Sequence, residues 1–354
     1  MNLRELNRAS LARQSLLERS SGATPTDMAE QLLGLQAQEP KPPFIGMWTR
    51  IDGFQAEDLR AALRGGEVVR ATLMRATLHL MSKRDYAAFR PALQPALDAA
   101  MESILKARGE GVVVEDTLAA ARKLLPRGKK MTFNEIRDAL SDRSPDVDHR
   151  ALGYVTRTGL PLVMVPTDDA WGFPRDSQFQ LAGKVSSKAD TEELVRRYLA
   201  AFGPATPADM QIWSGLKGLK EVFAALEDEL DVLDGGLYDV PGAPRPGSDT
   251  LAPVRFLPAF DNMLLAHKDR ARIIDEEHRP KVVTKNLRIH PTFLVDGFVA
   301  GMWSVKATKK KATLTLEPFG KLAKKVRAEL EKEGEALLRF AEPEVADVAV
   351  QFGA

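Results

Sequence analysis

The chain has 354 residues, of which 44% are hydrophobic and 28% are charged, an ordinary composition for a soluble globular protein. Single hydrophobic cores stop growing at about 250–300 residues, so several compact units are expected. The lack of cysteine excludes disulfides, thiolate metal sites and a cysteine nucleophile, and it fits a reducing cytoplasm. No stretch approaches about 18 consecutive apolar residues and the start of the chain lacks a signal-peptide core, so no membrane association is expected. A net charge of +1 gives no global sign of a nucleic-acid partner.

The first hundred residues predict three helices followed by a strand pair. Leucines at helical spacing and helix-ending prolines and glycines mark the helices, and an alternating, β-branched run marks the strands. The expected helices cover 4–19, 27–35 (capped by Thr26 and ended by Pro40, Pro42 and Pro43) and 56–66, and the expected strands lie within 68–81. This order is typical of a winged helix-turn-helix.

The same pattern returns twice along the chain, and a different one follows. The expected helices cover 116–125, 131–140, 148–159, 191–203, 206–215 and 219–230, with hairpins at 162–173 and 232–240. Residues 241–250 are rich in proline and glycine and predict a linker, after which short strand-like runs surround one helix at 320–341. We therefore predict an α+β fold with three tandem winged-helix units (1–98, 99–188 and 189–245) and a small β-barrel-like C-terminal domain (246–354).

Basic residues on the expected helices are candidate DNA contacts. The third helix of a winged helix enters the major groove, which points to Arg150 and Arg157 in the second unit and to Lys217 and Lys220 beside the third. Further basic residues cluster nearer the C-terminus: Lys268, Arg270, Arg272, Arg279, Lys281, Lys285, Arg288, Lys306, Lys309, Lys310 and Lys311. The alternatives are solvated surface charge and a winged helix that binds protein.

The most unusual polar feature is a pair of glutamines, Gln36 and Gln38, in the run Gly34-Leu35-Gln36-Ala37-Gln38-Glu39-Pro40. Residues two apart lie about 200° apart around a helix but share one face of an extended chain. Pro40 disfavours helical geometry at the preceding residue. The two amides are therefore expected to point the same way where a helix ends, and the alternative is a pair of exposed or capping amides.

Here the sequence resembles a known family. The runs LLGLQAQEPKPPFIGMWTRIDGF, LMRATLHLMS, RFLPAFDNMLLAHKDR and TFLVDGFVAGMW, within residues 3–305, look like the AlkZ-type glycosylases. These are bacterial winged-helix proteins first tied to self-resistance against the DNA crosslinker azinomycin. The resemblance implies three winged-helix units and a β-barrel-like domain in a C-shaped DNA clamp. The family's catalytic Gln–apolar–Gln motif falls on Gln36 and Gln38, and a related branch carries aspartate at the second position.

The resemblance also implies an activity: hydrolysis of the N-glycosidic bond of N7-alkylated purines in duplex DNA, in DNA repair or genotoxin self-resistance. Alkylation places positive charge on the purine, so the base is already a good leaving group, and two amide oxygens that position one water suffice. No lysine nucleophile is needed, which predicts a monofunctional enzyme without strand cleavage. Bulky adducts or interstrand crosslinks are the expected lesions. We expect a monomer at the bacterial nucleoid, in the cytoplasm, with no cofactor and no obligate protein partner.

Further residues near the motif are candidates for the site. Arg75 and His79, in MRATLHL, are predicted to share a strand face near the glutamines and to contact DNA, with packing as the alternative. The segment 282–297 predicts a hairpin, and Lys285, Arg288 and His290 are candidates for the DNA-probing hairpin that the family uses. Asp261 and Asn262 are expected to form a turn. The five histidines lack metal-ligand spacing, so no metal is expected.

Two other functions remain open from the sequence. A winged-helix transcription regulator would bind a specific sequence without chemistry, usually as a dimer. A sequestration protein would hold alkylated duplex without releasing the base. Aromatic residues, which a flipped base needs for stacking, do not cluster beside the glutamines, which favours a bulky lesion that stays in the duplex.

Overall fold

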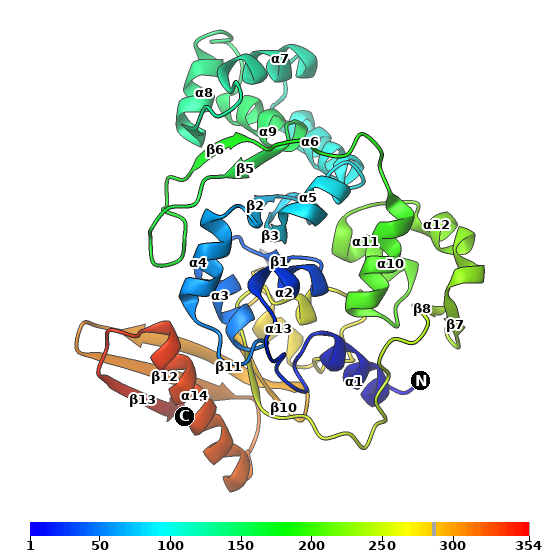
Figure 1. Cartoon of the computed structure of the whole chain (residues 1–354), viewed down its shortest axis with the longest axis vertical. Coiled ribbons are helices and arrows are strands. Elements are labelled where there is room, and N and C mark those ends of the chain that lie inside the picture. The colour runs from blue at the N-terminus through cyan, green and yellow to red at the C-terminus, as the bar shows by residue number, and fades with distance from the viewer. Residues whose placement is uncertain (285–287, 354) are drawn as a thin grey trace.

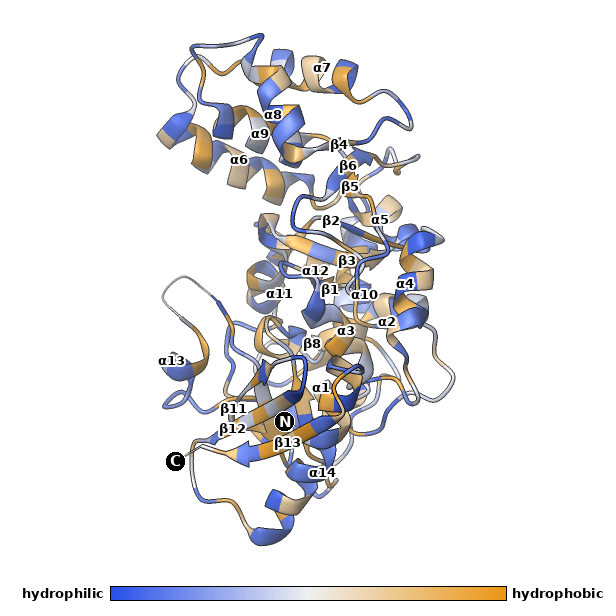
Figure 2. Cartoon of the chain, turned by 90° about the vertical axis from the view of Figure 1, so that its left-hand side faces the viewer, coloured by the Kyte–Doolittle hydropathy of each residue, from blue (hydrophilic) through white to orange (hydrophobic). Residues whose placement is uncertain are grey.

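The computed structural model describes residues 1–284 and 288–353. The chain is a mixed α+β protein, elongated, with a group of helices at one end and a five-stranded sheet at the other (Figure 1). In the perpendicular view, helices α6 (Gln94–Arg108) and α13 (Arg279–Val282) project on the same side of the molecule, above and below the central region (Figure 2). No helix in the described ranges has the length and apolar character needed to cross a membrane.

The N-terminal region contains four helices and three strands. They are α1 (Leu3–Arg13), α2 (Pro25–Gln31), α3 (Lys41–Trp48), α4 (Ala56–Arg64), β1 (Leu35–Gln36), β2 (Val68–Thr72) and β3 (Leu78–Ser82), with a 3-10 turn η1 at Met74–Ala76 between the last two strands. Thr24 rather than Thr26 caps α2 through the backbone N–H of Asp27. The prolines expected to end a helix instead begin α3. Proline lacks a backbone N–H, and the N–H groups of the first helical turn have no partner within the helix, so nothing is lost there.

The next region adds a helical layer and shares its strands with the first. Its elements are α5 (Lys83–Phe89), α6, α7 (Val114–Leu124), α8 (Phe133–Ser141), α9 (His149–Gly159), β4 (Met131–Thr132), β5 (Leu162–Met164) and β6 (Gln178–Leu181). Thr132 caps α8, as the sequence predicted. The hairpin expected at 162–173 is wrong, because β5 pairs with β6 across a longer connection, 165–177. The six strands form one sheet in the order β1-β3-β2-β5-β6-β4, in which Ala71 pairs with Val163.

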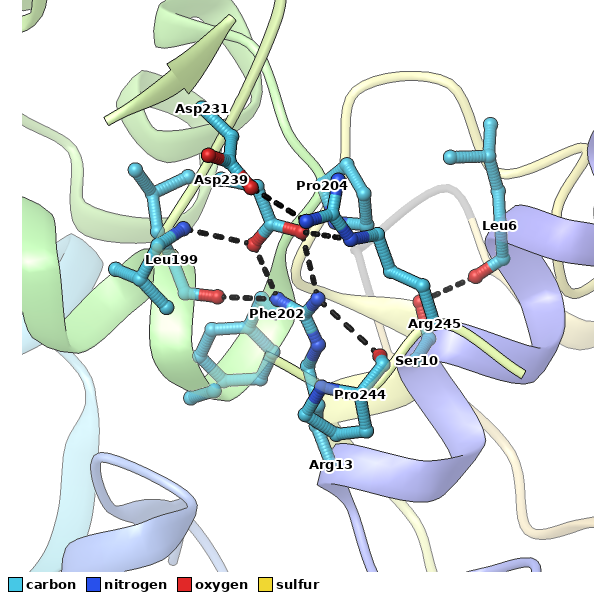
Figure 3. Close-up of polar contacts among 12 residues, drawn as sticks. Leu6, Ser10, Arg13, Leu199, Phe202, Pro204, Asp231, Asp239, Pro244 and Arg245 are labelled. Atoms are coloured by element: carbon cyan, nitrogen blue, oxygen red, sulfur yellow. Dashed lines mark hydrogen bonds and ion pairs between the residues drawn. The ribbon is translucent and has the colours of Figure 1, made fainter. Parts of the chain in front are cut away.

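The third region packs against α1. It contains α10 (Thr191–Phe202), α11 (Pro207–Ser214), α12 (Leu219–Ala225), a 3-10 turn η2 (Glu227–Glu229) and the predicted hairpin, β7 (Asp231–Leu233) with β8 (Leu237–Asp239). A buried ion pair fixes the two parts together: both Nη atoms of Arg13 donate to the carboxylate of Asp239, at 2.7 and 2.8 Å, and Nη1 also donates to the carbonyl of Leu199 (Figure 3). Thr206 caps α11 as predicted, whereas Asp190 rather than Thr191 caps α10.

The C-terminal region is built around an open sheet. Its elements are β9 (Arg255–Leu257), a 3-10 turn η3 (Asn262–Leu264), α13, β10 (Thr292–Val295), β11 (Phe298–Ala307), β12 (Lys311–Pro318), α14 (Lys324–Ala341) and β13 (Asp347–Phe352). The strand order is β13-β12-β11-β10-β9, and β12 and β13 run parallel. The barrel-like expectation is therefore corrected for the described residues: β13 and β9 are two separate edges. Helix α14 packs on the sheet and supplies the core contacts of Leu330, Leu337 and Leu338.

Candidate active site

The glutamine pair lies on a sharp turn that leads from α2 into β1. Leu33 and Gly34 have positive φ angles of 50° and 91°. A Cβ at Gly34 would lie 2.9 Å from the carbonyl oxygen of Leu80, so only glycine fits this close approach. Strand β1 then pairs antiparallel with β3, with Gln36 opposite His79. Gln36 and His79 therefore project from the same face of the sheet.

Arg70, on β2, takes the backbone carbonyl at the end of β1, although the N–H of Ala37 still donates to the carbonyl of Leu78 at 2.7 Å. Its Nε and Nη2 donate to the carbonyl of Ala37 at 2.9 and 2.7 Å, so this carbonyl is directed to the guanidinium. The backbone N–H of Leu78 donates instead to Oε1 of Gln38, at 3.3 Å. Burial lowers the pKa of Arg70 to about 10, which leaves the side chain charged at neutral pH. The chain is thus extended at Gln36, as the sequence predicted, whereas Gln38 lies in the bend that follows β1.

Gln36 is held firmly, since only 7% of it is exposed. Its Oε1 accepts a hydrogen bond of 2.8 Å from Nη2 of Arg75, and Nη1 of Arg75 donates to the carbonyl of Trp213 on α11. A guanidinium has donors and no acceptor, so the atom facing it must be the amide oxygen. Burial, and then the nearby charge of Arg270, lower the pKa of Arg75 to about 10. The structure therefore brings together Gln36 and Arg75, two of the residues singled out from sequence.

His79 lies in the interior beside this pair. It is 1% exposed, and its Nδ1 lies 3.0 Å from the carbonyl of Thr77, so Nδ1 carries the proton and donates. Burial, with a smaller contribution from the charge of Arg75, lowers the pKa of His79 to about 3. The ring is thus neutral at physiological pH, and its burial keeps it from a DNA phosphate in this conformation. His79 is thus buried opposite Gln36 in the β1–β3 pair, which is the packing alternative that the sequence left open.

A turn from the C-terminal region packs beneath the glutamine segment. Nδ2 of Asn262 donates to the carbonyl of Gly34 at 2.7 Å. The carboxylate of Asp261 accepts from both Nη atoms of Arg50, at 2.9 and 2.8 Å, and the two side chains are 2% and 1% exposed. Gln36 and these three residues line a cavity of about 10 Å³, which is about the space of one water molecule.

The Gln38 end of the segment is open. Gln38 is exposed, and the neighbouring Glu39 forms an ion pair of 3.0 Å with Arg288, in which the two side chains are 45% and 55% exposed. Val283 and Ile289 form an antiparallel bridge, within the segment 282–297 for which the sequence predicted a hairpin. Glu39, Arg288 and His290 all line a cavity of about 380 Å³. The structure thus places Arg288 and His290 next to the glutamine segment.

The remaining candidates lie elsewhere. Arg150 and Arg157 are on α9, in the helical layer beyond β5 and β6 (Figure 1). Arg150 is exposed, whereas Arg157 is partly buried with its guanidinium 5.1 Å from the ring centre of Tyr154. Lys285 lies outside the described residues. In the described ranges, no group of three or more histidine, aspartate or glutamate side chains is placed to hold a metal ion.

Three residues of the site were not found from the sequence. One feature of the sequence could have indicated Arg70, because it is a single charge inside the apolar alternating run of β2. No local pattern marked Arg50 or Trp213. The three are buried, at 4%, 0% and 1% exposure. Their contacts reach other elements, so spacing along the chain does not reveal them.

The fold is shared with a known DNA glycosylase. The Streptomyces sahachiroi DNA glycosylase AlkZ superimposes on the chain with a TM-score of 0.78, 21% sequence identity and complete coverage of both chains. At that identity the likeness establishes the fold. No curated relative matches significantly. The family model described as "DNA glycosylase AlkZ-like" matches residues 29–340, so the chain belongs to the AlkZ-like DNA glycosylase family. Membership supports a DNA glycosylase role with DNA as the substrate, as the sequence resemblance implied.

Proposed function

We propose that this protein is a monofunctional DNA glycosylase that hydrolyses the N-glycosidic bond of N7-alkylated purines in duplex DNA. Gln36 and Gln38 are the residues that position the attacking water. The observation that carries the proposal is the geometry of the glutamine segment: β1 presents one amide that is fixed by Arg75, and the bend after it presents a second, exposed amide two residues later. Gln36 lines the small cavity of about 10 Å³, and Glu39, the residue after Gln38, lines the cavity of about 380 Å³ together with Arg288 and His290.

The chemistry suits amide side chains. The alkylated purine is cationic, so the C1′–N9 bond breaks with its electron pair moving to the purine, which leaves as a neutral base. The sugar becomes an oxocarbenium-like species, a water oxygen bonds to C1′, and the released proton passes to solvent. An amide oxygen is too weak a base to take that proton, so the glutamines contribute orientation alone. Each carbonyl has two lone pairs, of which the described donors Arg75 and Leu78 each use one.

The rest of the proposal concerns how DNA is held. We propose three winged-helix units, with boundaries near residues 98, 188 and 245, that form a C-shaped clamp with the C-terminal region. Arg150, Arg157, Arg288 and His290 contact the DNA, and the family resemblance assigns Lys285 to the same group. Bulky adducts or crosslinks are the preferred lesions, and the protein acts as a monomer in DNA repair or genotoxin self-resistance.

The test is base release from a duplex containing one N7-alkylguanine. We expect release by the native chain and a loss on the order of 100-fold in Gln36→Ala and in Gln38→Ala, with duplex affinity nearly unchanged, because mispositioning costs rate rather than binding. Gln351→Ala, on β13, is the matched control and keeps the native rate. Tight binding of damaged duplex without release from small or bulky adducts would favour sequestration or transcriptional regulation instead.

A further inference from the structure

The contact between Arg75 and Gln36 leads to a role for Arg75 that differs from binding DNA. We propose that Arg75 is a positioning residue that selects the productive orientation of the Gln36 amide and links that orientation to the docking of α11. The inference rests on the proposed catalytic role of Gln36.

The need for such a residue follows from the chemistry of glutamine. The last side-chain torsion of glutamine is broad and nearly two-fold, so the amide oxygen and nitrogen exchange places at small cost unless a partner distinguishes them. Nη2 of Arg75, at 2.8 Å, is a donor only and therefore selects the oxygen. A flipped amide would present N–H groups where the attacking water needs an acceptor.

Arg75 is itself held on two sides. Nη1 donates to the carbonyl of Trp213 near the end of α11. A Cβ at Gly215 would lie 3.5 Å from both the backbone nitrogen and Cα of Arg75, so the end of α11 packs directly on this residue. The guanidinium therefore bridges α11 and the catalytic segment.

The backbone around Arg75 is strained in a way that suits a fixed role. Arg75 and Ala76 have φ angles of 54° and 55°, in the left-handed region that residues other than glycine rarely adopt. Such conformations persist where the surroundings enforce them, and they concentrate at functional sites. The short turn between β2 and β3 directs the side chain of Arg75 inward onto Gln36. His79, which lies opposite Gln36 in the strand pair, is neutral and therefore does not add a second cation beside the amide.

The experiment measures single-turnover excision of N7-methylguanine and duplex affinity for Arg75→Ala and Arg75→Lys. We expect Arg75→Ala to lower the single-turnover rate by on the order of 10- to 100-fold, with the dissociation constant changed by less than about threefold, and Arg75→Lys to recover part of the rate because it keeps a donor. Guanidinium chloride at tens of millimolar should restore excision by Arg75→Ala but not by Gln36→Ala, with sodium chloride at the same concentration as the control.

The outcomes separate this inference from the proposed function. If Gln36→Ala excises at the native rate, the catalytic role of Gln36 is wrong. If Gln36→Ala is defective while Arg75→Ala and Arg75→Lys excise normally, only the positioning role is wrong. If Arg75→Ala loses as much DNA affinity as excision rate, and guanidinium does not restore the rate, Arg75 binds DNA and does not position Gln36. If Arg75→Ala does not fold, Arg75→Lys alone tests the inference: a lower excision rate at unchanged DNA affinity supports it, and an equal loss of both contradicts it.

Discussion

The two ends of the glutamine segment differ in how the protein holds them. At the Gln36 end, the amide oxygen is bound by Arg75, the preceding turn is bound by Asn262, and a buried ion pair between Arg50 and Asp261 lies beneath. At the Gln38 end, the side chain is exposed and makes one long hydrogen bond, and the nearby ion pair of Glu39 is open to solvent. Two identical side chains, two residues apart, are therefore held very differently: the first is fixed by buried partners and the second is exposed. If the pair positions water as proposed, the first amide is ordered in advance and the second is the one that substrate can order.

The largest effect is expected at the buried ion pair. Arg50→Met removes one partner and leaves the carboxylate of Asp261 buried without a counter-charge, which should lower the free energy of unfolding by about 3–5 kcal/mol. Urea denaturation measures the change. The control is Arg60→Met on α4, where Arg60 pairs with the exposed Glu57 and the loss should stay below about 1 kcal/mol. Equal losses in the two variants would show that the Gln36 end is no more firmly held than the surface.

Lowering the pH should reduce the free energy of unfolding through His79, which lies opposite Gln36. Its folded pKa, about 3, lies below the unfolded value of about 6.5, so between these values only the unfolded chain takes the proton. The stabilisation is complete above pH 6.5 and falls as the pH drops, by about 1.4 kcal/mol per pH unit, or about 2 kcal/mol by pH 5.

Thermal or urea unfolding at several pH values measures this dependence. His79→Gln should remove that part of the pH dependence, whereas His149→Gln, at an exposed position on α9, should retain it. A pH dependence that is the same in both variants would contradict a neutral buried His79.

A smaller loss is expected from the turn beneath Gly34. Asn262→Ala removes the donor to the Gly34 carbonyl and should lower the free energy of unfolding by about 1.5 kcal/mol. It should also slow base release, because the turn into Gln36 loses its support. Asn134→Ala, on the exposed side of α8, should cost less than about 0.5 kcal/mol. Full excision by Asn262→Ala would show that β-pairing alone positions the segment.

The smallest effect on stability is expected at the open end. Arg288→Met should change the free energy of unfolding by less than about 1 kcal/mol, since both members of the pair with Glu39 are about half exposed. If Arg288 exchanges Glu39 for a phosphate, the slope of log affinity against log salt should become shallower by about 0.9. Titration of a duplex at several salt concentrations measures the slope, with Arg327→Met on α14 as a matched control. An unchanged slope would mean that Arg288 remains on Glu39.

The sequence predicted the parts of this site that depend on local geometry. Residue spacing and Pro40 predicted the extended chain at Gln36, although Gln38 lies in a bend. Thr132 and Thr206 marked helix starts correctly. Local patterns did not reveal α3, because proline both ends helices and begins them. They also did not reveal the contact of Asn262 with Gly34, which are 228 residues apart in sequence. The reach of Arg70 from β2 to the carbonyl of Ala37 likewise depends on strand pairing rather than on spacing.

The shared six-stranded sheet limits how this protein can be divided. Ala71 of β2 pairs with Val163 of β5, so backbone hydrogen bonding passes from the N-terminal region into the next. A fragment ending near residue 98 would leave β2 as a bare edge with mostly buried side chains, and such an edge invites pairing with other chains. The first two regions therefore cannot be separated or exchanged without exposing this sheet. Insertions or fusions should be better tolerated in the surface connection 165–177 than at the junction suggested by the repeat.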